Sequence, residues 1–210
     1  MKIVAAATPA KRAEVQQNIE EGKSPDTVRS LMKKKAKEIS MEVMRKVGIV
    51  MGSTSDLPVM EKAAKFLDEM EIPFEMNALS AHRTPDEVEQ FAREAEGRGV
   101  RVIIAGAGMA AALPGVIAAS TTLPVIGVPI KGMLDGLDAM LSIIQMPPGI
   151  PVATVGVNGA LNAAILAAEM MALSDEALAA KLKAYKQGLK EKIVKANEEL
   201  SQVKYKFKVN

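Results

Sequence analysis

The segment from Ser80 to Asp86 carries the side chains of this chain that are best suited to moving a proton. It reads Ser-Ala-His-Arg-Thr-Pro-Asp, and its His82 is the only histidine in 210 residues that include no cysteine. Because histidine is the side chain that ordinarily titrates near neutral pH, His82 is the first candidate for general acid–base catalysis. The guanidinium of Arg83 suits a phosphate, since its fork binds oxygens in pairs. In the structural alternative, His82 caps a helix or satisfies a backbone group, and Arg83 pairs with Asp86.

A second segment, Gly52 to Asp56, could hold a sugar phosphate. Gly52 lets the backbone approach a ligand closely. The hydroxyls of Ser53 and Ser55, together with the amides of the helix predicted to follow, could hold a phosphate. Asp56 would repel phosphate, but its carboxylate could accept hydrogen bonds from ribose hydroxyls. The alternative is that Ser55 or Asp56 is only the N-cap of that helix.

A third segment, Ala105 to Met109, resembles half of a dinucleotide-binding fingerprint. It lacks the third glycine at the usual place, and no acidic residue ends a second strand about 20 residues later. The segment therefore favours a turn whose backbone amides meet a flat ring or a carboxylate over a nucleotide-cofactor site.

Short apolar runs alternate with helical stretches from Val47 onward, which predicts a parallel sheet covered by helices on both faces. The predicted strands are 47–51, 74–79, 100–105, 124–130 and 151–157. The predicted helices are 57–70, 84–97, 110–120, 136–144, 162–173 and 175–203. The expected fold class is α/β, a three-layer sandwich with a five-stranded parallel sheet. Because ligands bind outside the carboxyl ends of such strands, the three segments should converge on one edge.

The composition excludes several classes of protein. Apolar residues make up 49% of the chain and aromatic residues only 3%, so the core must be aliphatic. No apolar run reaches the roughly 20 residues of a membrane span, and the apolar start is too short for a signal peptide. A chain without cysteine has no disulfide and no thiolate zinc site, and a single histidine argues against a transition-metal site. We therefore expect a cytoplasmic protein without a metal.

The first 45 residues differ from the rest and are expected to form a helical extension, with the α/β domain and its long C-terminal helix in residues 46–210. Residues 1–46 carry 11 basic and 6 acidic side chains, whereas the remainder carries 16 and 19. Ser or Thr followed by Pro predicts helices over Pro9–Glu21 and Pro25–Lys46. The basic run Lys33–Lys37 favours a solvated face over nucleic-acid or membrane contact, because aromatic side chains that could stack on bases are almost absent.

From Val47 to about Lys190 the chain resembles the N5-carboxyaminoimidazole ribonucleotide mutases of purine biosynthesis, the catalytic subunit of phosphoribosylaminoimidazole carboxylase. Eight stretches match in order and spacing, and the resemblance as a whole spans about two thirds of the chain. The resemblance implies a flavodoxin-like sandwich that assembles as an octamer with sites between subunits. The stretches are residues 51–56, 80–86, 104–108, 113–115, 123–129, 136–138, 145–147 and 151–155.

The resemblance also implies roles for individual residues. His82, assisted by Ser80, shuttles a proton while a carboxylate moves from the exocyclic nitrogen of the aminoimidazole to ring carbon C4. Backbone amides near Ala107 and Gly108 could hold CO2 beside the ring. No metal or organic cofactor is required. The residues expected to bind the ribonucleotide substrate are Gly52, Ser53, Ser55, Asp56, Arg83, Ala107, Gly108 and Leu113, with Ser80 helping at the phosphate.

The chain departs from the usual family pattern, which reads Gly-Gly-Ala-Ala-His-Leu-Pro-Gly where this chain reads Gly108 to Gly115. Ala112 stands where a second histidine is expected, and Met109 replaces a common glycine. The segments Lys131–Asp135 and Asn158–Leu161 are also less polar than usual. Losing a positioned acid–base group could cost about 10²–10⁴-fold in rate.

Three functional hypotheses follow from these departures. The first is an active mutase; direct carboxylation by CO2, a related activity in the same family, stays open beside it. The second is a scaffold, naturally diverged or deliberately altered, whose role is symmetric assembly. The third is a relative that acts on a different carboxylated ring nucleotide. Methionines such as Met109 and Met133 are expected to fill the core or a subunit interface.

Overall fold

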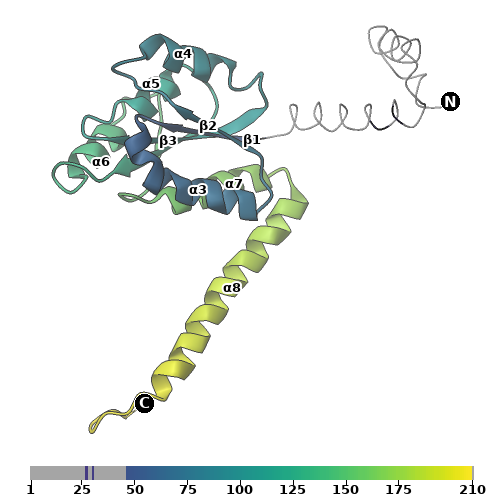
Figure 1. Cartoon of the computed structure of the whole chain (residues 1–210), viewed down its shortest axis with the longest axis vertical. Coiled ribbons are helices and arrows are strands. Elements are labelled where there is room, and N and C mark those ends of the chain that lie inside the picture. Colours follow the sequence, from purple (N-terminus) through teal and green to yellow (C-terminus); the bar gives the residue numbers. More distant parts are fainter. Residues whose placement is uncertain (1–26, 28–29, 31–45, 210) are drawn as a thin grey trace. The chain divides into compact units, whose positions relative to one another are not determined.

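The computed structural model describes Thr27, Ser30 and residues 46–209. Backbone contacts divide the chain between Met44 and Arg45, and the fold below is that of the second unit (Figure 1). Of the helices expected before residue 46, only Thr27 and Ser30 lie within the described residues, and both are helical. The expected end of the second helix at Lys46 is wrong, since Lys46 is the first residue of a strand.

A five-stranded parallel sheet forms the centre of this unit, which confirms the predicted fold class. The strand order is β2-β1-β3-β4-β5, so the chain steps outward in both directions from β1. The long β3 and the shorter β4 are apolar and buried almost throughout, as expected for central strands covered on both faces. The strands are β1 (Lys46–Met51), β2 (Phe74–Ala78), β3 (Val100–Gly108), β4 (Val125–Ile130) and β5 (Ala153–Thr154).

Helices cover both faces of the sheet, so the unit is a three-layer sandwich (Figure 1). Helices α3 and α7 pack together on one face, while α4, α5 and α6 cover the other. No helix of the described residues combines the length and apolarity that crossing a membrane requires. The helices are α3 (Leu57–Glu69), α4 (Pro85–Glu94), α5 (Leu113–Ala119), α6 (Leu137–Ile144), α7 (Ala160–Ala172) and α8 (Glu176–Ser201); a short 3-10 turn, η1 (Thr54–Asp56), precedes α3.

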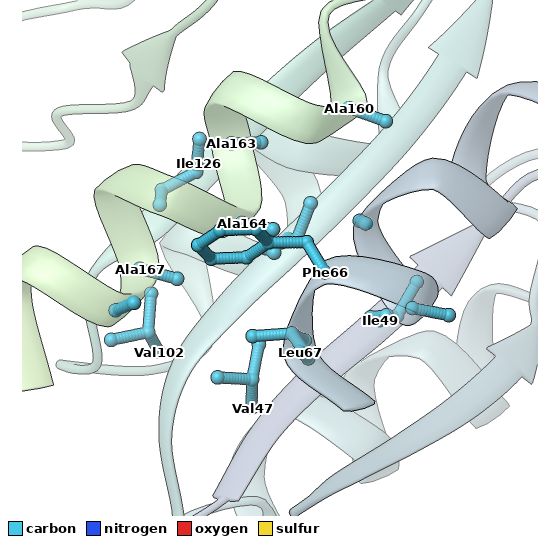
Figure 2. Close-up of a cluster of buried hydrophobic side chains, with 14 of the residues drawn as sticks. Val47, Ile49, Phe66, Leu67, Val102, Ile126, Ala160, Ala163, Ala164 and Ala167 are labelled. Atoms are coloured by element: carbon cyan, nitrogen blue, oxygen red, sulfur yellow. The ribbon is translucent and has the colours of Figure 1, made fainter. Parts of the chain in front are cut away.

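An alanine stripe on α7 brings that helix close to the sheet. The buried alanines recur at the three- and four-residue spacing of one helix face. Phe66 and Leu67 of α3 pack beside this stripe and over the strands (Figure 2). Because alanine adds little bulk, strand and helix backbones approach closely and the core needs few aromatic side chains. The stripe consists of Ala160, Ala163, Ala164, Ala167 and Ala168.

Several element boundaries differ from the sequence prediction, among them those of β5 and α4. Strand β5 contains only Ala153 and Thr154, although one further bond, from the Val155 amide to the Gly127 carbonyl, continues the pairing at 3.1 Å. Pro151 has no amide hydrogen to contribute, which shortens the strand at its start. Helix α4 ends at Glu94 instead of residue 97, because Gly99 has a φ of 89° and turns the chain into β3.

The carboxyl ends of β1, β2 and β3 lie side by side, which positions the candidate site. Met51 is in register with Ala78 on one side and with Gly106 on the other. The pairing continues past the strands, since the Gly52 amide donates to the Gly106 carbonyl at 3.1 Å and the Leu79 amide donates to the Met51 carbonyl at 2.9 Å. The loops that follow these strands therefore leave the sheet from adjacent points.

Candidate active site

The turn from Ser53 to Asp56 is held by a reciprocal capping box. The Ser53 hydroxyl accepts a hydrogen bond from the Ser55 amide at 3.3 Å, and the Asp56 carboxylate accepts one from the Ser53 amide at 3.2 Å. The Ser55 hydroxyl also donates to Asp56, at 3.4 Å. The capping residue is thus Ser53, at the N-cap of η1, and not Ser55 or Asp56 as the alternative had it. Asp56 occupies the N-cap position of α3, but its side chain makes no cap hydrogen bond there. Ser55 is exposed and Ser53 half-buried, so a ligand at this edge of the sheet can still reach their hydroxyls.

Burial dominates the electrostatics of Asp56. It raises the pKa of this carboxyl above its ordinary value, because the charged form is poorly solvated there. Hydrogen bonds from the Ser53 amide and the Ser55 hydroxyl oppose this effect, and so does the positive charge of Arg83. Asp56 is thus a hydrogen-bond acceptor whose two oxygens are oriented by the turn itself.

The loop from Ser80 to Thr84 is closed by the Thr84 side chain. The Thr84 hydroxyl accepts a hydrogen bond from the Ser80 amide at 2.9 Å and donates to the Ser80 carbonyl at 3.2 Å. The amides of Arg83 and Thr84 also donate to that carbonyl, at 3.2 and 2.8 Å. His82 lies within this closed turn and is exposed, and no hydrogen bond or ion pair within residues 46–209 engages its imidazole. The ring is therefore free to meet a ligand instead of serving the fold.

Arg83 joins the two loops. Its Nη2 donates to the Gly52 carbonyl at 2.8 Å, and its Nε donates to the Ser80 hydroxyl at 3.1 Å. The structural alternative, a pair with Asp86, does not occur among the described ion pairs. Two of the five guanidinium N–H groups are used in these bonds, so three remain for an anion. The side chain thus ties the His82 loop to the Gly52–Asp56 turn and still presents positive charge at the surface.

The end of β3 differs from the expected turn at Ala107 and Gly108. Both residues still belong to the strand and are in register with Pro129 and Ile130 of β4. The chain leaves the sheet one residue later, at Met109, whose φ is 57°. A turn that presents backbone amides therefore begins at Met109.

Leu113 does not present its side chain to the site. It is 2% exposed and packs in the core cluster on the α4 and α5 face of the sheet. As the first residue of α5, it could contribute only its backbone. A periodic apolar pattern offers no means of separating a pocket-lining leucine from a core leucine.

Ala112 is the residue immediately before α5, in a helical backbone conformation and without a side-chain cap. It is half-buried, whereas Met109 nearby is exposed. The position that the family pattern assigns to a second histidine thus lies at the start of a helix that follows the third strand of the site.

The sequence did not predict two residues that position the loops of the site. Thr84 was expected only as the start of a helix, but its hydroxyl closes the His82 loop. A hydroxyl side chain four residues after Ser80 and directly before a proline is the sequence signal for this turn. Asn158 joins two loops at the same edge of the sheet. Its side-chain oxygen accepts from the Lys131 amide at 2.9 Å, and its own amide donates to the Pro129 carbonyl at 2.8 Å.

The site offers hydroxyls, a guanidinium, a carboxylate and one imidazole at a single edge of the sheet. Within the part of the chain that the structure describes, no group of three or more His, Cys, Asp or Glu side chains could hold a metal ion. The available chemistry is thus binding of a hydroxylated, anionic ligand together with proton transfer by His82.

Comparisons with known proteins bear on the same residues. Residues 46–192 match the family model described as AIR carboxylase. The chain belongs to the AIR carboxylase family. All three segments that form the candidate site lie within the range that the family covers.

This chain covers most of the length of the mutases that it resembles. A protein of Pyrococcus abyssi named N5-carboxyaminoimidazole ribonucleotide mutase is 60% identical over 148 residues, which are 70% of this chain and 85% of that protein. A protein of the same name from Thermotoga maritima is 52% identical over 168 residues, or 80% of this chain and 98% of that protein. The crystal structure of Treponema denticola PurE superposes with a TM-score of 0.68 at 32% identity and covers 74% of this chain and 98% of that one.

Proposed function

We propose that this chain catalyses the isomerisation of N5-carboxyaminoimidazole ribonucleotide in purine biosynthesis, moving the carboxylate from the exocyclic nitrogen to ring carbon C4. The observation that carries the proposal is the placement of His82. Its imidazole is exposed in a closed turn, and Arg83 ties that turn to the Gly52–Asp56 segment. The mutase relatives, at 52% to 60% identity, support the same activity.

The proposed reaction keeps every atom of the substrate. The bond between the exocyclic nitrogen and the carboxylate carbon breaks, CO2 is released, and the nitrogen takes up a proton. Carbon C4 then attacks the retained CO2, forming a carbon–carbon bond, and loses its own proton. His82 donates the first proton and accepts the second, so the imidazole ends in its starting state. Ser80 assists this proton transfer from the same turn.

The geometry of the two loops supports the proposed binding roles. The hydroxyls of Ser53 and Ser55 and the oriented carboxylate of Asp56 suit the ribose phosphate portion of the substrate. The N–H groups of Arg83 that its own chain leaves unused suit the phosphate, with the Ser80 hydroxyl beside them. We expect Ala107 and Gly108 at the end of β3, with the backbone from Met109 onward, to contact the ring or CO2.

The decisive assay supplies N5-carboxyaminoimidazole ribonucleotide labelled with ¹³C in its carboxylate and follows the product by NMR. We expect the label on C4, formed without ATP. Added unlabelled CO2 distinguishes the two activities. A mutase transfers the labelled carboxylate of its own substrate, whereas a direct carboxylase joins unlabelled CO2 to aminoimidazole ribonucleotide. A folded protein that forms no C4 product from either starting compound contradicts the proposal.

A second function, assembly without catalysis, is favoured by Ala112, which removes the second family histidine. Ala112→His separates the two. If the missing imidazole limits turnover, the variant gains at least about tenfold in kcat, since one positioned acid–base group contributes about 10²–10⁴-fold. A scaffold instead shows no thermal shift with aminoimidazole ribonucleotide, either in the parent protein or in the variant.

Octameric assembly and a cytoplasmic location are part of the same proposal. His82, Arg83 and Ser55 are exposed on a single chain, so a neighbouring subunit is a natural means of covering the CO2 that the reaction must retain. Mass measurement in solution tests the octamer, and cell fractionation tests the location.

A further inference from the structure

The outer strand β2 leaves one edge of the sheet open. Among the described residues β2 pairs only with β1, because it is the first strand in the order of the sheet. The Val47 amide donates to the Pro73 carbonyl at 3.0 Å, just before β2 begins, and the Leu79 amide donates to the Met51 carbonyl at 2.9 Å, just after it ends. Parallel strands bond through alternate residues, so the odd-numbered residues of β2 face β1. The amides and carbonyls of the even-numbered residues, Met76 among them, therefore point away from the sheet.

The open edge of β2 has little of the usual protection against a further strand. Lysines, prolines and unpaired charges on an edge strand are the common means of preventing such pairing. β2 contains no lysine or proline, and its one charge, on Glu75, is neutralised by Arg98 and Lys46, each at 2.8 Å. Met76 is 37% exposed and Ala78 is exposed as well, so another strand can reach this edge.

A groove with a volume of about 350 Å³ lies between the edge of β2 and helix α4. Its apolar lining includes Leu79 and Phe91, which pack in the core on this face of the sheet. Arg98 also lines the groove, and its guanidinium lies 4.9 Å from the centre of the Phe91 ring. Ligand pockets usually measure about 300–1,000 Å³, so this small groove suits the side chains of a segment that lies along β2.

The polar lining of the groove is acidic. Glu87, Gln90 and Glu94 recur at the three- and four-residue spacing of one face of α4, so they lie in a row along the groove. Gln90 donates to Glu94 at 3.0 Å, whereas no hydrogen bond or ion pair within residues 46–209 engages the carboxylate of Glu87. The cation of the lining, Arg98, is already bonded to Glu75. A basic side chain that enters the groove thus meets a carboxylate that the fold does not use.

We propose that β2 binds an extended, basic segment of a partner protein, which joins the sheet as a further strand. The backbone of this segment bonds to the outward amide and carbonyl of Met76. Its alternate side chains on the α4 face are lysine or arginine, which match the charge of Glu87. The side chains between them are apolar, because they lie on the face to which Phe74 packs. This surface lies outside the candidate site, so the contact does not depend on the proposed catalysis.

The first test measures peptide binding to the full chain by fluorescence anisotropy. The probe is a fluorescein-labelled peptide of sequence Val-Lys-Val-Lys-Val-Lys-Val, and the matched control peptide carries glutamate in place of each lysine. We expect the lysine peptide to bind at least about tenfold more tightly at low salt, and the preference to shrink as salt is added. Equal affinity for the two peptides overturns the proposal. Binding of neither peptide, as when a second copy of the chain already covers the edge, overturns it too.

The second test separates strand addition from simple attraction of charge. Met76→Pro removes an amide that points away from the sheet and leaves the bonds between β2 and β1 in place. Affinity for the lysine peptide should fall at least about tenfold, whereas the control Met76→Thr, which keeps the amide, should stay within about threefold of the parent. Circular dichroism establishes that both variants are folded. Equal affinity of folded Met76→Pro and Met76→Thr overturns strand addition.

Hydrogen-exchange mass spectrometry of the parent chain decides the same point without a substitution. The lysine peptide should slow exchange in residues 74–78, and a bound peptide that leaves this exchange unchanged overturns strand addition. Glu87→Lys tests the charge of the groove and should weaken the lysine peptide at least about tenfold. Glu89→Lys is the matched control, because Glu89 lies on the same helix but outside the lining of the groove. Equal effects of the two reversals refute a specific role for the groove.

Discussion

Replacing His82 by asparagine separates a catalytic imidazole from a structural one. The side chain is exposed, and its ring takes part in no hydrogen bond or ion pair of the described residues 46–209. Surface substitutions of this kind change the free energy of unfolding by about 0.5 kcal/mol or less. Loss of a positioned acid–base group, in contrast, lowers the rate by about 10²–10⁴-fold, which corresponds to about 2.7–5.5 kcal/mol of transition-state stabilisation.

The expected result for His82→Asn is thus a large fall in kcat with almost no change in thermal stability. Affinity for the ribonucleotide should stay within about threefold, because Arg83 and the Ser53–Asp56 turn are untouched. The assay combines single-turnover formation of the C4-carboxylated product with calorimetric binding and a thermal melt. Asp86→Asn is the control, since Asp86 is an exposed residue at the start of α4 and should leave kcat nearly unchanged. A variant that retains more than about a tenth of the parental kcat refutes the assignment of His82 as the proton shuttle.

Three further predictions concern the frame around this residue. Arg83→Met removes the hydrogen bonds to Gly52 and Ser80 and also the free N–H groups. The Kd of the ribonucleotide in calorimetry should rise at least about tenfold, which corresponds to the loss of one charge-assisted contact. An unchanged Kd would contradict phosphate binding by Arg83. Gly127→Ala places a Cβ against Ile143 and 3.2 Å from Cγ1 of Val152 in the core. Overpacking of this kind should lower the free energy of unfolding by about 1–3 kcal/mol in denaturant titration. The control Gly156→Ala should leave the free energy of unfolding unchanged, because nothing lies within 4 Å of the added Cβ. Burial raises the pKa of Asp56 in the folded protein, so its carboxylate lowers stability at neutral pH. Asp56→Asn should therefore raise the thermal midpoint at pH 7, and this gain should vanish as the pH falls below the ordinary carboxyl pKa of 3.8. A gain that persists at low pH would show another cause.

The sheet was predictable because its central strands carry an unambiguous pattern. β4 and the part of β3 that follows Arg101 are continuous apolar runs between glycine- and proline-containing loops, and such runs indicate buried parallel strands. β5 was predicted too long, because apolar composition around Pro151 does not reveal which residues find a partner in β4. Pairing depends on the neighbouring strand, and a single stretch of sequence does not contain that information.

The candidate site was predictable at the level of segments and less so at the level of atoms. Segments that follow the strands of a parallel sheet lie at the same edge, so the sequence predicts that His82 and the Gly52–Asp56 turn are neighbours. The bond from Arg83 to the Gly52 carbonyl joins residues 31 positions apart, and only the folded geometry reveals it. The side chain of Leu113 lies in the core, a detail that its motif does not reveal, so its expected contact with the substrate stays a prediction for the backbone alone.

The bridge made by Arg83 determines how a ligand would meet this edge of the sheet. Two loops that leave different strands are already aligned by one side chain before anything binds, so association needs little rearrangement of the protein. A compact lysine in its place would keep the positive charge yet could not reach the Gly52 carbonyl and the Ser80 hydroxyl with the same flat fork. The fold therefore sets the orientation of the turn that carries His82 before any ligand binds.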